Sequence, residues 1–224
     1  MTPPTRTVPV LAALLAGALL TGCGGPEPVA GATPGPRPTS APAVTPSGAS
    51  AVASAVARVG ADGSACPLPV SFGTAAGWKP RAVEAPKDPD FAELLRQGPA
   101  ELVCEIDAKP AGNIGFLRVW TVRGGAARAA LEGFVKAGEK ASAIVHRKTV
   151  AGTGTGTGTE SVPAAEVTYT VLDGLTEEDK EERAFAVAAP GGTVIVHLGG
   201  FDTAEHRAML PAYELARTSL RTAP

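Results

Sequence analysis

Hydrophobic and polar residues alternate with two distinct periods over residues 64–224. A period of two is typical of strands with one buried face, and it predicts strands over 66–72, 81–85, 102–106, 115–123, 167–171, 185–187 and 194–198. A period near 3.6 predicts helices over 88–97, over 126–141 and from Asp202 onward, where Glu205 follows as in a capping box. Strands and helices in this order, with a hairpin at Gly191-Gly192, predict an α+β domain.

The first 22 residues carry a different pattern, an apolar run over 10–20 behind a start that holds one charged side chain, Arg6. The run ends in Leu20-Thr21-Gly22-Cys23. A short charged start, an apolar core and small residues before a cleavage point predict a secretory signal. The apolar run is about ten residues, below the roughly 18 that a membrane span needs, so we favour a signal over an anchor helix.

The end of this signal resembles the bacterial lipobox, in which leucine and two small residues precede a cysteine. The resemblance implies cleavage after residue 22 and a diacylglyceryl group on Cys23. Two acyl chains give stable attachment to a bilayer. We therefore expect a lipid-anchored protein on the outer face of the cell membrane.

Residues 24–63 contain seven prolines among Ala, Gly, Ser and Thr, with few large apolar side chains. Such a segment buries too little surface to offset the entropy of ordering. We expect a disordered tether over 23–63 that holds a single folded domain, 64–224, away from the bilayer.

The charge of the chain bears on its partners, and its cysteine content bears on disulfide bonding. The formal net charge is −2 and the charges are scattered, which argues against a nucleic-acid partner. The chain has three cysteines, and lipidation of Cys23 leaves Cys66 and Cys104. Both fall on the apolar parity of a predicted strand. In an oxidising compartment, we expect these two to form a disulfide.

The order of segments in the domain resembles the LpqN/LpqT-type lipoproteins of high-GC Gram-positive bacteria. The resemblance rests on Gly77-Trp78, a long strand with an amphipathic helix, 162–165 leading into Val167-Thr168-Tyr169, then 183–187 and a terminal helix. That family has a PsbP-like fold. The resemblance implies an α/β/α sandwich around an antiparallel sheet and a binding or accessory role at the cell envelope, with no catalytic residues to carry over.

Two segments suggest ligand chemistry but lack the residues that it needs. The Gly-Thr tract over 152–159 has no Lys-Ser/Thr ending to grip a phosphate, so we interpret it as a hairpin connection. The acidic run over 177–182 lacks the spacing and central glycine of a calcium loop, so we interpret it as a solvated turn.

The remaining candidates for catalysis or metal binding are isolated in the sequence. Three histidines, His146, His197 and His206, have no metal-ligand spacing and are expected to be exposed or hydrogen-bonded in place. No serine sits in a nucleophile elbow. We therefore expect no enzyme, no metal and no cofactor.

The chain has only two tryptophans, Trp78 and Trp120. We expect them to pack in the core rather than to line a ligand site. Three functions stay open: a tethered protein-binding module, which we favour, a small-molecule or lipid-binding domain, and a hydrolase with dispersed residues. The sequence does not name the partner or ligand, which we expect to be an envelope protein or an apolar molecule.

Overall fold

The structure is a computed structural model that describes residues 55, 57–86, 88–138, 140–152, 161–174 and 176–222. The predicted signal over 1–22, the lipidation site Cys23, nearly all of the expected tether and most of the Gly-Thr tract lie outside these residues. Neither α-helix in the described part is long and apolar enough to cross a membrane.

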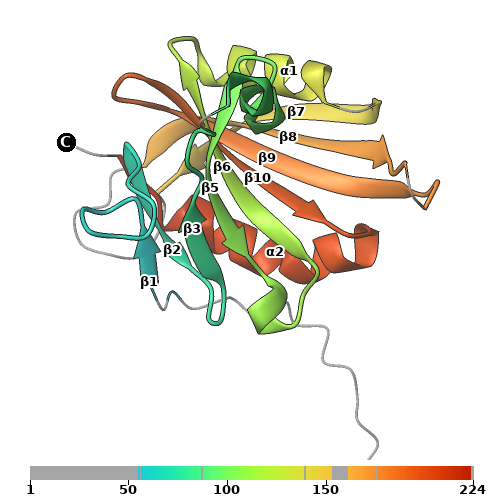
Figure 1. The fold of residues 1–224 in the computed structure, drawn as a ribbon, viewed down its shortest axis with the longest axis horizontal. Coiled ribbons are helices and arrows are strands. Elements are labelled where there is room, and N and C mark those ends of the chain that lie inside the picture. The colour runs from blue at the N-terminus through green and yellow to red at the C-terminus, as the bar shows by residue number, and fades with distance from the viewer. Residues whose placement is uncertain are drawn as a thin grey trace, which may run out of the picture. The chain divides into compact units, whose positions relative to one another are not determined.

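Eight strands form the main sheet, in the order β3-β5-β6-β10-β9-β8-β7 with β4 beside β5, and every pairing is antiparallel (Figure 1). The strands are β3 (Lys79–Ala82), β4 (Arg96–Gln97), β5 (Ala100–Asp107), β6 (Gly115–Arg123), β7 (Ala141–Ala151), β8 (Val162–Leu172), β9 (Asp179–Ala189) and β10 (Gly192–Gly200). With two helices, this confirms the predicted α+β fold.

One face of the main sheet is covered by helix α2 (Thr203–Thr218) and a second, three-stranded sheet. That sheet pairs β2 (Val70–Thr74) with β1 (Ala57–Val59) and β11 (Arg221–Thr222). The side chains between these layers form one apolar core, which includes the fully buried Phe72, Phe185 and Tyr213. We call this the α2 face.

The opposite face carries helix α1 (Ala127–Ala137), which lies on the other side of the sheet from α2 in Figure 1. Alanine, leucine and phenylalanine recur on one side of α1 because their spacing follows the helical period. Its buried Leu131 and Phe134 pack on Trp120, Ile195 and their neighbours in a second core. We call this the α1 face.

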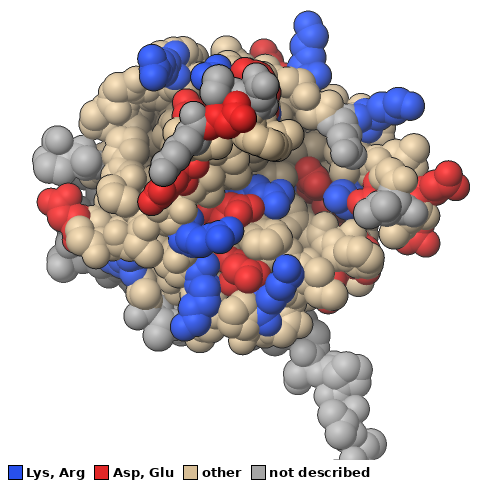
Figure 2. Space-filling view, in the orientation of Figure 1, with Lys and Arg blue, Asp and Glu red and all other residues tan. Residues whose placement is uncertain are grey.

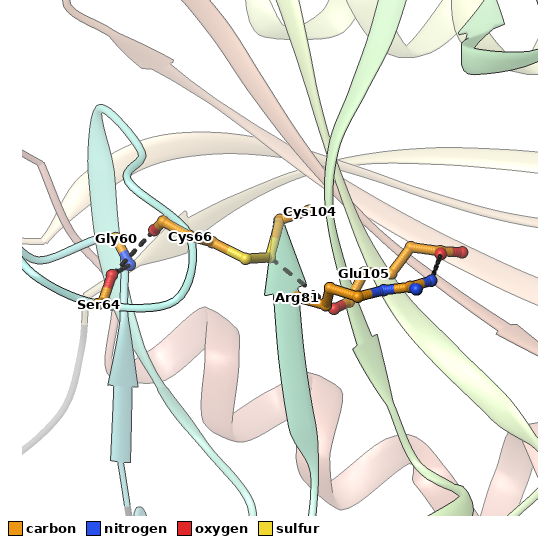
Figure 3. The surroundings of a disulfide bond; sticks show 6 residues. All are labelled: Gly60, Ser64, Cys66, Arg81, Cys104 and Glu105. Atoms are coloured by element: carbon orange, nitrogen blue, oxygen red, sulfur yellow. Dashed lines mark hydrogen bonds and ion pairs between the residues drawn. A yellow bond between two sulfur atoms is a disulfide. The ribbon is translucent and has the colours of Figure 1, made fainter. Parts of the chain in front are cut away.

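The disulfide between Cys66 and Cys104 is present, with the two Cα atoms 5.9 Å apart, which confirms the predicted pairing (Figure 3). The expectation that each cysteine lies on the apolar side of a strand is right for Cys104, on the buried side of β5, and wrong for Cys66. Cys66 lies in a loop before β2, and the amide of Gly60 and the hydroxyl of Ser64 donate to its carbonyl. The expected strand over 66–72 therefore begins only at Val70.

Three other expectations need correction. The domain begins before residue 64, because Val59 is fully buried and β1 pairs with β2. The expected helix over 88–97 is a 3-10 helix, η1 (Pro89–Leu95), followed by β4, and its Phe91 and Leu94 are exposed. Strand β7 was missed because it is an edge strand whose residues are mostly exposed, so it shows no alternation.

Candidate ligand-binding site

A bulge in β5 decides which side chains reach the open part of the α1 face. The pairing of β5 with β6 shifts between Leu102 and Cys104, which leaves Val103 as the extra residue. A bulge of this kind reverses the alternation of the residues that follow. Leu102 therefore faces α1, Cys104 and the next alternate residues face α2, and Glu105 is placed on the α1 face.

Four polar side chains then align across neighbouring strands. Arg81 of β3 pairs in register with Glu105 of β5, Glu105 with Arg118 of β6, and Arg118 with His197 of β10. Arg118 Nε donates to Glu105 Oε1 at 2.9 Å, and Arg81 Nη2 lies 3.5 Å from Glu105 Oε2. We call this row the polar ladder. Basic and acidic side chains alternate over the middle of the face seen in Figure 2.

A half-open cavity of about 810 Å³ lies over this ladder. All four ladder residues line it, together with Val83, Glu84, Gln97 and the apolar side chains of Leu94, Leu95, Leu102 and Trp120. The cavity thus has a polar floor and an apolar wall. A mixed lining of this kind suits a small organic ligand that carries both characters.

Part of the apolar wall comes from Leu94 and Leu95 at the end of η1. Residues 94–97 belong to η1 and β4, and Gln97 Nε2 donates to the carbonyl of Phe134 at 2.9 Å, which ties this segment to α1. Phe134 in turn packs edge-on against Trp120 and His197, with ring centroids 5.3 and 5.4 Å apart. Helix α1 therefore supports both aromatic rings at the cavity from behind.

His197 belongs to a buried network with Glu182 of β9 and Tyr169 of β8. His197 Nε2 lies 3.0 Å from Glu182 Oε2 and 3.2 Å from the Tyr169 hydroxyl. Burial alone would raise the pKa of Glu182, but the charge and hydrogen bond of His197, together with Lys180 and Tyr169, hold it at about 2. Burial and then the charge of Glu182 raise the pKa of Tyr169 well above its ordinary value. The network thus holds an ionised carboxylate and a protonated phenol.

Two nitrogen atoms of the cavity-lining rings are buried without a hydrogen-bond partner, Nε1 of Trp120 and Nδ1 of His197. Each of these residues is only 6% exposed. Buried polar groups are nearly always paired, because an unpaired one costs free energy in the folded state. Three further nitrogens of this kind, on His146, Arg183 and His206, belong to residues outside the cavity, whereas the two on Trp120 and His197 belong to residues that line it.

Both tryptophans pack in a core, as expected. Trp78 is buried in the core of the α2 face, and Trp120 packs in the core of the α1 face while also lining the cavity. His197 is buried and hydrogen-bonded through Nε2, as expected, but its Nδ1 has no partner. His206 is buried in α2, and burial followed by the charge of Arg183 lowers its pKa to about 4. His146 is half-buried on the edge strand β7.

The interpretation of the acidic run as a solvated turn is wrong for its second half. Asp179 begins β9, and Glu182 is the buried partner of His197. The sequence signal was the alternation of 180, 182 and 184 on one face of a strand, but adjacent acidic residues concealed it. Among the described residues, no three His, Cys, Asp or Glu side chains are grouped to hold a metal ion.

Comparison with known proteins adds the family. The model of a family described as uncharacterised lipoprotein, Lipoprotein_23, matches residues 36–220. Neither a curated protein nor a solved structure matches the chain. The family match spans the cavity, both helices and the main sheet. The chain therefore belongs to this lipoprotein family, which makes it an extracytoplasmic lipoprotein of the cell envelope.

Proposed function

We propose that this lipoprotein is a non-catalytic module that binds a small organic ligand in the cavity of the α1 face. The observation that carries the proposal is the pair of buried, unpartnered nitrogens on Trp120 and His197 at a cavity of about 810 Å³. The cavity size falls in the range of known small-molecule sites. This choice favours the small-molecule alternative over the protein-binding module that the sequence alone led us to expect.

The same geometry supports a binding role rather than catalysis. In the described part of the chain, the side-chain hydroxyl bonded to His197 is that of Tyr169. Its raised pKa keeps it protonated, which makes it a poor nucleophile. His197 Nε2 is already committed to Glu182. The network is therefore suited to fixing the ring of His197 rather than to moving a proton.

Anchoring and fold type complete the proposal. Cleavage before Cys23 and its lipidation would place the domain on the outer face of the cell membrane, on the tether that precedes β1. A helix on each face of an antiparallel sheet supports a PsbP-like domain of the LpqN/LpqT type.

The lipid anchor is tested by the replacement Cys23→Ala, which should leave unprocessed precursor. Protease added to intact cells should digest the wild-type domain. Normal processing of the variant would overturn the lipidation part.

The ligand site is tested by titrating the purified protein with the neutral fluorescent probe N-phenyl-1-naphthylamine. We expect saturable binding with one site per chain. Val83→Trp places a bulky ring in the cavity and should weaken binding at least tenfold. Val150→Trp is the matched control, because Val150 is 42% exposed on β7 and does not line the cavity.

Three outcomes would contradict the proposal. The first is an absence of saturable binding by any apolar or amphipathic probe. The second is an equal loss of binding in Val83→Trp and Val150→Trp, which would place the probe outside the cavity. Turnover of an envelope substrate that is abolished by one cavity side-chain change, in a variant that still folds, would replace the binding role by an enzymatic one.

A further inference from the structure

We infer that the ligand of the α1-face cavity is an amphipathic organic acid, whose acidic group bonds to Arg118 and Trp120 and whose apolar body lies against Val83, Leu95 and Leu102. The inference rests on the proposed function and names the chemical class of its ligand. It follows from the hydrogen-bonding capacity of the floor and from the position of the apolar wall.

The floor of the cavity has more donors than acceptors. Arg81 and Arg118 share the single carboxylate of Glu105, and Arg118 uses only its Nε for that bond. A guanidinium carries five N–H groups, so the two Nη groups of Arg118 remain available. The ring of Phe116 lies under this guanidinium, 5.0 Å from it, and keeps it in place. Guanidinium groups bind carboxylates through two parallel hydrogen bonds.

Trp120 adds a second donor of a different kind. Its indole Nε1 can only donate, and it is buried without a partner on the same strand and face as Arg118. Side chains two residues apart on one face of a strand are neighbours. A ligand that carries only donors, such as an amine, would leave Nε1 unpaired. A carboxylate, which only accepts, satisfies both Trp120 and Arg118.

The two acidic residues that line the cavity, Glu84 and Glu105, balance the two guanidinium groups, and the side chains of Arg81 and Glu84 are both exposed. The free donors of Arg118 and Trp120, and not the net charge, therefore favour an acid. The remaining lining decides the rest of the ligand. Val83, Leu95 and Leu102 have no polar side-chain atoms, so they suit an aliphatic or aromatic body rather than a sugar acid or an inorganic anion.

The test compares acids with neutral molecules of the same shape. Binding of decanoate and decanol, and of 2-naphthoate and 2-naphthol, is measured by calorimetry on the purified protein and by displacement of N-phenyl-1-naphthylamine. We expect each acid to bind at least tenfold more tightly than its neutral partner. Whether decanoate or naphthoate binds better distinguishes an aliphatic from an aromatic body.

Two variants locate the acidic group. Arg118→Gln and Trp120→Phe should each reduce the preference for acid over neutral molecule about tenfold, measured as the ratio of the two affinities in the same variant. Arg123→Gln is the matched control, since Arg123 is exposed at the end of the same strand and outside the cavity. If Trp120→Phe does not fold, Arg118→Gln carries the test alone.

The inference is wrong if decanol and naphthol bind as tightly as their acids, or if Arg118→Gln weakens acid and neutral probe equally. In either case the neutral probe still binds and the proposed function stands. If calorimetry detects no binding of either acid while the neutral probe saturates the cavity, the ligand class is overturned. If nothing binds, both proposals fail together.

Discussion

The two faces of the main sheet are built differently. On the α2 face, a helix and a second sheet cover the strands, a disulfide joins the loop before β2 to β5, and Phe72, Phe185 and Tyr213 are fully buried. On the α1 face, helix α1 covers part of the sheet, and the polar ladder and its cavity occupy another part. One face is therefore closed by packed elements, while the other leaves an open cavity.

Helix length accounts for much of this difference. Helix α2 has 16 residues and α1 has 11. At about 1.5 Å per residue, the helices are roughly 24 and 16 Å long. Seven strands side by side, at about 4.8 Å spacing, span roughly 29 Å. Helix α1 is too short to reach every strand, and the second sheet adds cover only to the α2 face.

The largest expected effect comes from removing the covalent tie of the α2 face. Replacing Cys66 and Cys104 together by alanine opens a loop with a sequence separation of 38 residues. Loss of this constraint should lower the free energy of unfolding by about 3–4 kcal/mol, measured by urea denaturation. Binding of the neutral probe to the folded variant should stay within about twofold, since the cavity lies on the other face. Equal denaturation midpoints with and without the disulfide would contradict this account.

The next effect concerns pH. Burial and the charge of Arg183 lower the pKa of His206 to about 4, whereas an unfolded histidine titrates near 6.5. Protonation is therefore unfavourable in the folded state, and stability falls as pH drops from about 6.5 towards 4, with a total loss of roughly 3 kcal/mol. His206→Gln removes this group and should flatten the stability profile over that window.

His146 provides the matched control for this prediction. Burial, followed by the charge of Arg128, lowers its pKa as well, but His146 is only half-buried on the edge strand β7. His146→Gln should change the profile much less than His206→Gln. If the two variants flatten the profile equally, the pH response does not come from the buried position in α2.

A third effect compares the two buried tyrosines, one on each face. The Tyr213 hydroxyl donates to Glu166 Oε1 at 3.0 Å, and Glu166 is only 8% exposed. Tyr213→Phe should cost about 2 kcal/mol, because this buried carboxylate loses its donor. Tyr169→Phe should cost about half as much, since Glu182 keeps His197 and Lys180. If Tyr169→Phe lowers the free energy of unfolding more than Tyr213→Phe does, the expected order of the two hydrogen bonds is wrong.

The smallest effect is expected on the outer side of α1. Arg128 Nε donates to Glu132 Oε1 at 2.6 Å, but both side chains are about half exposed. An exposed pair at this spacing contributes about 0.3–0.5 kcal/mol. Arg128→Ala should therefore change the unfolding free energy by no more than about 0.5 kcal/mol. A loss above about 1 kcal/mol would show that this helix has a partner on its outer side.

Local periodicity predicted some elements well and others poorly. Strands over 115–123, 167–171, 185–187 and 194–198 were found because one or both faces of each are buried, so apolar residues recur along them. The helix expected over 88–97 was wrong, since Phe91 and Leu94 have helical spacing but are exposed. Strand β7 was missed because exposure at a sheet edge removes the selection for alternation.

The sequence by itself was enough for features that depend on neighbouring residues or on composition. These are the lipoprotein class, which the family match confirms, the α+β class and the cysteine pair Cys66 and Cys104. The signal, the lipidation of Cys23 and the part of the tether before residue 55 rest on the same kind of local pattern and stay predictions, because they lie outside the described residues.

Only the tertiary structure brought the candidate site together. Arg81, Glu105, Arg118 and His197 come from four strands and become neighbours through strand pairing and the bulge at Val103. Glu182 and Tyr169 join His197 through two further pairings. Pairing partners are chosen by which faces pack against α1 and α2, and this choice depends on residues far apart in the chain. No local pattern carries that information, so the sequence showed only single histidines, tryptophans and acidic residues where the fold makes one site.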